Sequence, residues 1–130
     1  MNILQVIPEL DAGGAERTTI EVAEAVVGAG GRCLVASLGG RLEGELEAAG
    51  ARLVRLDMKT KNPLALWRNA ARLSDVIQAE GVDLVHARSR APAWSAKWAA
   101  RRSGKPFVTT YHGTYAARSA LKRRYNSIMA

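Results

Sequence analysis

The sequence has almost no cysteine and no long apolar run. Its only cysteine, Cys33, lies in the apolar stretch 33–36, where we expect a small buried hydrophobic residue. One thiol excludes an internal disulfide and a cysteine-based zinc cluster, and we expect no thiol catalysis. No apolar run approaches the roughly 20 residues that span a bilayer. Met1 leads into apolar residues 3–7 without the basic segment of a secretory signal, so we expect a cytoplasmic protein.

Acidic residues are scarce in the second half of the chain. Residues 1–65 carry 7 basic and 9 acidic side chains, and residues 66–130 carry 12 basic and 3 acidic, which puts the second half at +9 within a total of +7. This imbalance favours an anionic partner: phosphate on a small substrate, an anionic membrane surface or nucleic acid. Nucleic acid is not expected, because no aromatic residues are interleaved with the basic ones and no module signature is present.

Several ligand-binding motifs are also missing. No Asp-x-Asp pair is present to hold a divalent cation on a diphosphate, so we expect no metal. Gly13-Gly14 is not followed by the lysine of a P-loop and lacks the spacing of the dinucleotide fingerprint. The second apolar run ends in Ala36-Ser37-Leu38, without the acid that holds a ribose in NAD-binding domains. We therefore expect no cofactor.

The sequence does contain an alternation of short apolar runs and helix-patterned segments. This predicts an α/β fold, a Rossmann-like parallel sheet of about five strands with helices on both faces, in one domain over residues 1–130. The expected strands are Asn2 to Ile7, Arg32 to Ser37, Ala51 to Leu56, Val82 to Ala87 and Pro106 to Tyr111. The expected helices are Gly14 to Ala29, Arg41 to Ala49, Pro63 to Glu80 and Pro92 to Ser103, with a helix-prone segment from Ala116 to Ala130.

Local signals mark the ends of these helices. Asn62 before Pro63 has the pattern of an N-cap followed by proline at the first helical position. Gly81 and Gly104 are the expected stops of the third and fourth helices. The first helix has an apolar stripe at helical spacing, which predicts its buried face: Ala15, Thr19, Val22, Ala23, Val26 and Val27.

Ligands of open parallel sheets bind beyond the carboxyl ends of the strands, where polar loops follow three of the expected strands. Gly13-Gly14 precedes the first helix and would either let the backbone approach a phosphate or merely relieve steric crowding. His112 lies in a polar turn after the fifth strand, which favours a functional role. His86 fits equally a buried strand residue or a part of the site.

Two further pairs have more than one interpretation. Arg88 and Arg90 flank Ser89 just beyond the fourth strand, where strand alternation would aim both the same way to grip phosphate or carboxylate. A pair of solvated arginines is the alternative. Trp94 and Trp98 share one helical face, and we interpret them as packing residues rather than as a sugar-stacking platform.

Basic residues gather in two places. One cluster lies near Trp67 and the other at 122–124, and the residues are Lys59, Lys61, Arg68, Arg72, Lys122, Arg123 and Arg124. Each cluster alone is most simply a solvated face. Together with the charge of the second half, they support contact with anionic lipid head groups as a secondary hypothesis, and with it a peripheral position on the inner face of the plasma membrane.

The order of these motifs resembles the N-terminal half of family-four glycosyltransferases, which are retaining enzymes of the GT-B fold. The resemblance covers essentially the whole chain. It is carried by residues 3–8, 13–17 and 82–87. Residues 87–94 and 109–113 are more narrowly similar to bacterial members that add hexoses, often mannose, to the lipopolysaccharide core.

This resemblance implies transfer of a hexose from a nucleotide-sugar donor to a glycan or lipid-linked acceptor with retention and without a metal, in lipopolysaccharide or cell-envelope biosynthesis. His112 would be the catalytic residue beside the transferred sugar, and the backbone of Gly13-Gly14 would face the donor diphosphate and the acceptor. Further donor or acceptor contacts are expected from Glu16, Arg17, Arg88, Ser89, Arg90, Tyr111 and Gly113.

The resembled family continues into a second, C-terminal Rossmann-like domain that supplies most nucleotide contacts, and we expect this chain to be the N-terminal domain without it. One alternative is a non-catalytic basic module that binds an anionic membrane surface or a phosphate-bearing ligand. Another is a phosphate-binding receiver domain. It would need an acidic cluster at the strand ends, where Asp57 is the only acid that we place.

We therefore expect the 130-residue chain alone to transfer no sugar and to bind nucleotide sugars weakly, because one wall of a two-domain cleft leaves most nucleotide contacts unmade. A transfer assay with labelled nucleotide sugars checks this. Robust turnover by the purified chain would contradict it.

Overall fold

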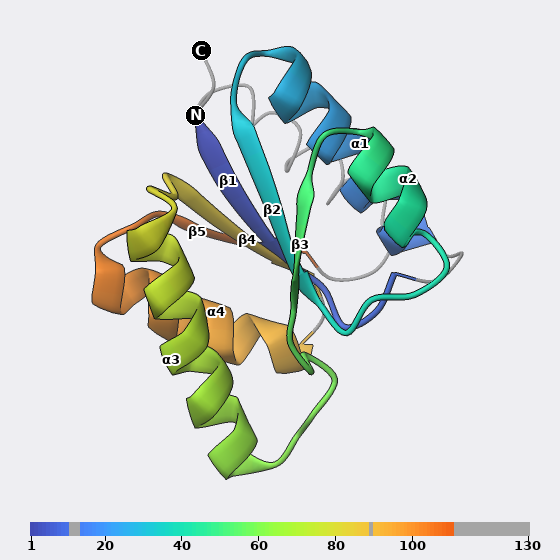
Figure 1. Cartoon of the computed structure of the whole chain (residues 1–130). Coiled ribbons are helices and arrows are strands. Elements are labelled where there is room, and N and C mark those ends of the chain that lie inside the picture. The colour runs from blue at the N-terminus through green and yellow to red at the C-terminus, as the bar shows by residue number, and fades with distance from the viewer. Residues whose placement is uncertain (11–13, 89, 111–130) are drawn as a thin grey trace.

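A computed structural model of the chain describes residues 1–10, 14–88 and 90–110, with the backbone alone at positions 15, 90, 91 and 110. The strands are β1 (Asn2–Val6), β2 (Arg32–Ser37), β3 (Arg52–Arg55), β4 (Leu84–Arg88) and β5 (Phe107–Thr110). The helices are α1 (Gly14–Gly28), α2 (Glu43–Ala48), α3 (Pro63–Ala79) and α4 (Arg90–Ser103) (Figure 1). In this part of the chain, no helix combines the length and the apolar character needed to cross a membrane.

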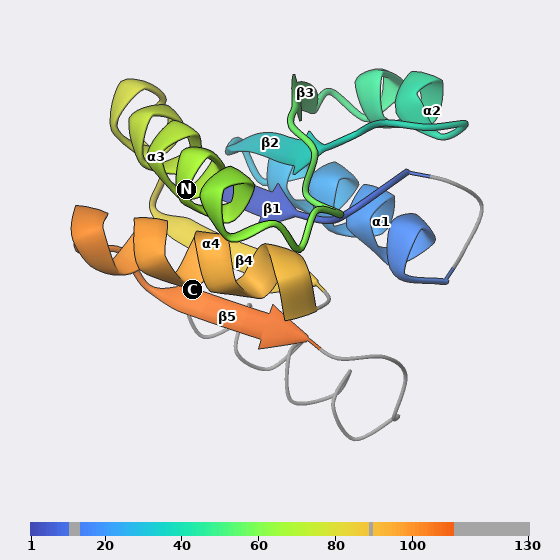
Figure 2. The same cartoon turned by 90° about the horizontal axis from the view of Figure 1, so that it is seen from below.

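The five strands form one parallel sheet in the order β3-β2-β1-β4-β5. The chain first moves outward from β1 to β2 and β3, then returns through α3 to β4 on the other side of β1 (Figures 1 and 2). The direction of winding therefore reverses between β1 and β4. This confirms the predicted Rossmann-like α/β fold and adds the position of its topological switch point.

Of the helices in the described part of the chain, two cover each face of the sheet (Figure 1). One apolar cluster joins the sheet to α3 and α4, and a second joins it to α1 and α2. Successive strand residues point to opposite faces, so Leu4 and Val6 of β1 belong to the first cluster while Ile3 belongs to the second. The central strands are apolar on both faces for this reason, as expected of a parallel sheet covered by helices.

The inner face of α4 is made of alanines. Four of them belong to the cluster under α3 and α4, and all are buried: Ala93, Ala96, Ala99 and Ala100. Between the two helices, the Ser95 hydroxyl donates to the Leu66 carbonyl at 3.0 Å. Small side chains let the helix backbone lie close to the sheet.

Several element boundaries differ from the prediction by one or two residues, among them those of α4 and β4. Helix α4 begins at Arg90, two residues before the expected start at Pro92, because proline fits anywhere in a first turn whose N–H groups have no helical partner. Strand β4 starts at Leu84, since the Val82 N–H donates to the Ile77 carbonyl and so belongs to the end of α3. The strand also extends to Arg88, which pairs with Thr110 of β5.

The predicted helix-end signals are confirmed. The Asn62 side chain accepts hydrogen bonds from the N–H groups of Leu64 and Ala65, at 2.9 and 3.4 Å. Gly81 and Gly104 follow α3 and α4 with φ of 62° and 69°, a left-handed conformation that glycine adopts without a steric penalty.

Replacing the cap residue tests this account of α3. We expect Asn62→Ala to lower the free energy of unfolding by about 1 kcal/mol, because two N–H groups of the first turn lose their acceptor. Urea denaturation of the two chains measures the difference. Asn62→Asp is the control, since its carboxylate can still accept both hydrogen bonds; a loss as large for Asn62→Asp as for Asn62→Ala would contradict the capping role.

Candidate functional site

The switch point lies at the carboxyl ends of β1 and β4, where open α/β sheets form their ligand crevice. Gln5 and Val6 of β1 pair there with His86 and Ala87 of β4. Two helices begin at the same edge, α1 at Gly14 after β1 and α4 at Arg90 after β4. The N–H groups of a helix's first turn favour anions, so two partial positive charges flank the switch point.

A chain of buried polar groups runs from α1 across the sheet to β4. An Nη atom of Arg88 donates to Oε1 of Gln5 at 2.9 Å, and Nε2 of Gln5 donates to the Thr19 carbonyl of α1 at 2.9 Å. Gln5 is fully buried and Arg88 is 4% exposed. The amide of Gln5 thus ties the arginine at the end of β4 to the second turn of α1.

Two titratable side chains lie beside this chain of groups on the same face of the sheet, and both are buried. Burial raises the pKa of the Cys33 thiol to about 11, against smaller opposing effects of a hydrogen bond from Gln5 and the charge of Arg88. Burial, and then the charge of Arg88, lowers the pKa of His86 to about 2. Both side chains are neutral at pH 7, so the positive charge of this cluster resides on Arg88.

These findings resolve two questions left open by the sequence. His86 is a buried residue of β4, neutral and enclosed, and Cys33 is the small buried residue that its apolar setting predicted. Arg88 was expected just beyond the fourth strand, but it is the last residue of β4. Arg90 starts α4, so the alternation of a strand does not extend to it.

The half of the edge formed by β2 and β3 is occupied by internal ion pairs. Arg55 at the end of β3 bonds Glu43 at 2.6 Å and the Leu38 carbonyl at 2.8 Å. Hydrogen bonds from Arg55 and from the Gly40 N–H lower the pKa of the Glu43 carboxyl. Lys59 pairs with Glu9 at 2.8 Å. Polar groups here bind one another, which leaves the switch point as the better candidate site.

The other predicted site residues are distributed unevenly. Gly14 begins α1 and Glu16 lies in its first turn. Arg17, also in α1, forms an ion pair with Glu45 of α2, so its guanidinium is engaged outside the buried cluster. Five predicted residues lie outside the described part of the chain: Gly13, Ser89, Tyr111, His112 and Gly113. The 122–124 cluster and the helix-prone segment 116–130 lie outside it as well.

Gln5 is the residue that the sequence reasoning missed. The apolar pattern places it in the first strand without a role of its own, whereas in the structure it connects β1, α1 and β4. A lone amide inside an otherwise apolar, buried strand predicts hydrogen bonds to neighbouring elements. A buried amide needs partners for both its oxygen and its nitrogen.

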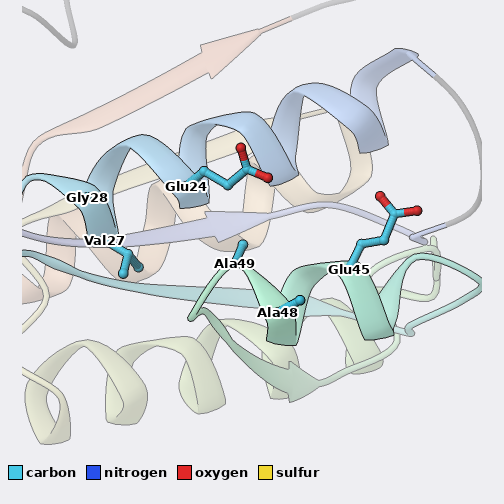
Figure 3. Close-up of a pocket in the computed structure, with 6 residues that line it drawn as sticks. All are labelled: Glu24, Val27, Gly28, Glu45, Ala48 and Ala49. Carbon is cyan, nitrogen blue, oxygen red and sulfur yellow. The ribbon is translucent and has the colours of Figure 1, made fainter.

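The groove between α1 and α2 is a less suitable anion site. It has a volume of about 480 Å³ and is lined by Glu24, Val27, Gly28, Glu45, Ala48 and Ala49. Figure 3 shows the two carboxylates on neighbouring helices. Glu45 is paired with Arg17, and the charge of Glu24 opposes a phosphate-bearing ligand. Among the described residues, no three His, Cys, Asp or Glu side chains gather as a metal site would require.

Solved structures share this fold. A glycosyltransferase from Rickettsia africae is 41% identical to this chain, with a TM-score of 0.78, over 98% of this chain and 34% of its own length. MurG from Acinetobacter baumannii (16% identity, TM-score 0.69, 94% of this chain, 38% of MurG) has the same fold. The C-terminal domain of a hydrogenase from Pyrococcus furiosus also has this fold, with 17% identity and a TM-score of 0.63 over 84% of this chain and 90% of that domain. The fold is therefore shared by proteins of different function.

The sheet order and the Rossmann-like layers match the N-terminal half of GT-B glycosyltransferases. The family model described as Glycosyltransferase Family 4 matches residues 12–130, and the chain belongs to that family. It spans about one third of the length of the Rickettsia glycosyltransferase. A search of the curated proteins gives no match.

The buried histidine predicts a pH dependence of stability. The pKa of His86 is about 2 in the folded chain and about 6.5 in the unfolded chain. Below pH 6.5 the unfolded chain binds a proton there and the folded chain does not, so the free energy of unfolding falls as the pH falls, by about 2 kcal/mol between pH 7 and pH 5.

Urea denaturation at both pH values, with His86→Gln for comparison, measures this contribution. Glutamine is polar and does not titrate, while the carboxyl groups titrate alike in both chains. We expect the His86→Gln chain to lose about 2 kcal/mol less between pH 7 and pH 5. Equal losses in the two chains would show that His86 is not held neutral.

Proposed function

We propose that this chain is the N-terminal domain of a sugar-transferring enzyme and forms one wall of its site at the carboxyl ends of β1 and β4. The enzyme moves a hexose from a nucleotide-sugar donor to a glycan or lipid-linked acceptor, with retention of the anomeric configuration. Membership of Glycosyltransferase Family 4 supports the reaction class. The observation that carries the location is the buried guanidinium of Arg88 at the topological switch point.

The electrostatics of the switch point suit an anionic ligand. Arg88 carries the charge of its cluster, because Cys33 and His86 are neutral at pH 7. Its surroundings are buried, and a charge is screened less there than in water. An anion bound over the ends of β1 and β4 would therefore be attracted by Arg88 and by the first turns of α1 and α4.

The fixed position of Arg88 also matters for catalysis. Its hydrogen bond to Gln5, which is itself bonded to Thr19, holds the charge in place before a ligand arrives. Preorganised charge lowers the barrier of a reaction in which negative charge develops on a leaving diphosphate. We assign Arg88 this electrostatic role rather than a wide contact with the ligand, since it is 4% exposed.

In the proposed reaction, the bond from the anomeric carbon to the diphosphate oxygen breaks. The acceptor hydroxyl oxygen forms the new bond on the same face of the sugar, and the hydroxyl proton leaves with the nucleoside diphosphate. His112 would lie beside the transferred sugar, and the backbone at Gly13-Gly14 would face the diphosphate. Glu16, Arg17, Ser89, Arg90, Tyr111 and Gly113 remain proposed contacts, and a second domain would supply most of the nucleotide contacts. No metal is required by this scheme.

The proposed substrate class rests on sequence. Residues 87–94 and 109–113 are similar to bacterial members of the family that add hexoses, often mannose, to the lipopolysaccharide core. We therefore propose a role in building the cell envelope from the cytoplasmic side of the plasma membrane.

Transfer of labelled sugar by the full-length protein that contains this chain tests the proposal, with GDP-mannose and UDP-glucose as donors and lipopolysaccharide core as acceptor. We expect Arg88→Met to lower kcat/KM by about 100-fold, because the preorganised charge is lost, and His112→Ala to lower kcat by orders of magnitude. Melting temperatures monitor folding.

The matched control is Arg32→Met, since Arg32 is exposed at the amino end of β2 and pairs with Glu80. It should retain wild-type turnover. Near-wild-type turnover by both Arg88→Met and His112→Ala would remove the switch point from the mechanism, and absence of transfer from either donor would reject the proposed substrate class.

A further inference from the structure

Several large apolar side chains are exposed on the outer surface of the α3–α4 layer. Leu64 is 61% exposed, Trp67 49% and Trp94 45%. Together with the partly buried Trp98, they form what we call the aromatic patch. Single exposed apolar residues are ordinary, but a cluster that combines several large ones marks an interaction surface.

Ring contacts hold the aromatic patch together. The ring of Trp67 packs edge-on against Trp94, with centroids 5.5 Å apart, and against Trp98, with centroids 4.9 Å apart. The guanidinium of Arg102 lies 5.2 Å from the centre of the Trp98 ring. The packing interpretation of Trp94 and Trp98 is confirmed, with Trp67 as their shared partner. The rings are fixed by one another, yet about half of Trp67 and Trp94 faces solvent.

Basic side chains lie on the same two helices as the aromatic patch, or next to them. We call five exposed residues on or next to the two helices the basic rim: Lys61, Arg68, Lys97, Arg101 and Arg102. Asp75 is the one acidic residue in the sequence of α3 and α4. The two helices that carry the aromatic patch therefore have a large excess of basic residues.

The members of the basic rim form no ion pair with a carboxylate of the described residues. Four arginines outside the rim do pair with acids: Arg32 and Arg52 with Glu80, Arg55 with Glu43, and Arg17 with Glu45. Among the described residues, none of the ion pairs involves a member of the basic rim. The positive charge of this layer is thus available to an external anion.

We propose that the aromatic patch and the basic rim dock this domain on a membrane surface rich in anionic phospholipid. Tryptophan is favoured at the membrane interface, because its ring is apolar while its N–H can bond to head groups. Leu64 would enter the acyl boundary, and the basic rim would contact lipid phosphates. Charge complementarity selects a lipid surface over a second copy of this chain, whose own patch would be equally positive.

The orientation that follows brings the membrane close to the candidate site. In a parallel sheet the crossover helices begin at the carboxyl edge of the strands, and Leu64, Trp67 and Trp94 lie in the first two turns of α3 and α4. Figure 2 shows the two helices side by side on one face of the sheet. If the proposed function holds, a lipid-linked acceptor would reach the end of β4 without leaving the surface.

The chain carries its own probe for this contact, because all three of its tryptophans belong to the aromatic patch. Intrinsic fluorescence is measured with vesicles of phosphatidylcholine alone, and with vesicles of equal parts phosphatidylcholine and phosphatidylglycerol. We expect a blue shift and co-sedimentation with the anionic vesicles only, and quenching when the anionic vesicles carry brominated acyl chains. This readout involves no sugar transfer, so it can fail or succeed independently of the proposed function.

Two double variants separate the components of the contact. Lys97→Gln with Arg101→Gln should weaken binding to the anionic vesicles by about 30-fold, as expected for two basic residues beside an anionic surface. The matched control removes two basic residues outside the rim, Arg41→Gln with Lys105→Gln, and should change binding less than 3-fold. Leu64→Ser with Trp94→Ser should weaken binding by at least about 10-fold, with Leu38→Ser as the exposed apolar control.

Circular dichroism and thermal melting show whether each variant is folded; Lys97, Arg101 and Arg41 are exposed, and Lys105 is half-buried. Loss of binding in both the rim variant and the patch variant, with the controls intact, supports the proposal. Binding that is equal for neutral and anionic vesicles would overturn it. Equal weakening by rim and control variants would overturn it as well, as would concentration-dependent dimerisation through Trp94 without vesicle binding.

Discussion

The amide of Gln5 is the contact on which the arrangement of the candidate site depends. A buried guanidinium needs hydrogen-bond acceptors, and a buried amide needs both a donor and an acceptor. Arg88 and the Thr19 carbonyl satisfy the two ends of Gln5 at once. One side chain of β1 therefore fixes α1, which covers one face of the sheet, relative to the end of β4. The strand order places these three elements together, since β1 lies between β2 and β4.

Much of the fold follows from the sequence alone. Apolar runs of strand length predicted five strands, and Asn62, Gly81 and Gly104 marked helix ends correctly, because capping and left-handed turns depend on neighbouring residues. The start of α4 was misplaced, since Pro92 is equally compatible with the first or third position of a helix. The strand order was not predicted: periodicity reports which faces are buried and not which strand lies beside which.

The candidate site was harder to predict than the fold. The expectation for Arg88 placed it in a loop, whereas pairing with β5 extends the strand to include it. Its link to Gln5 joins residues 83 positions apart in the sequence, and no local pattern reports such a contact. The grouping of Trp67 with Trp94 and Trp98 likewise depends on how α3 packs against α4. Long-range pairing is thus the information that sequence patterns lack, for the site and for the aromatic patch alike.

The alanine face of α4 has a mechanical consequence. Because its methyl groups lie directly against the sheet, the helix has little freedom to move inward or to rotate. Arg90 at the start of the helix follows Arg88 by two residues, and Trp94 lies one turn further on the outer side. A larger side chain at Ala93 or Ala96 would push the helix away from the sheet. The start of α4, which follows the end of β4, and the outer surface around Trp94 would then shift together. Helix α4 thus couples the packing of the interior to the position of the outer surface.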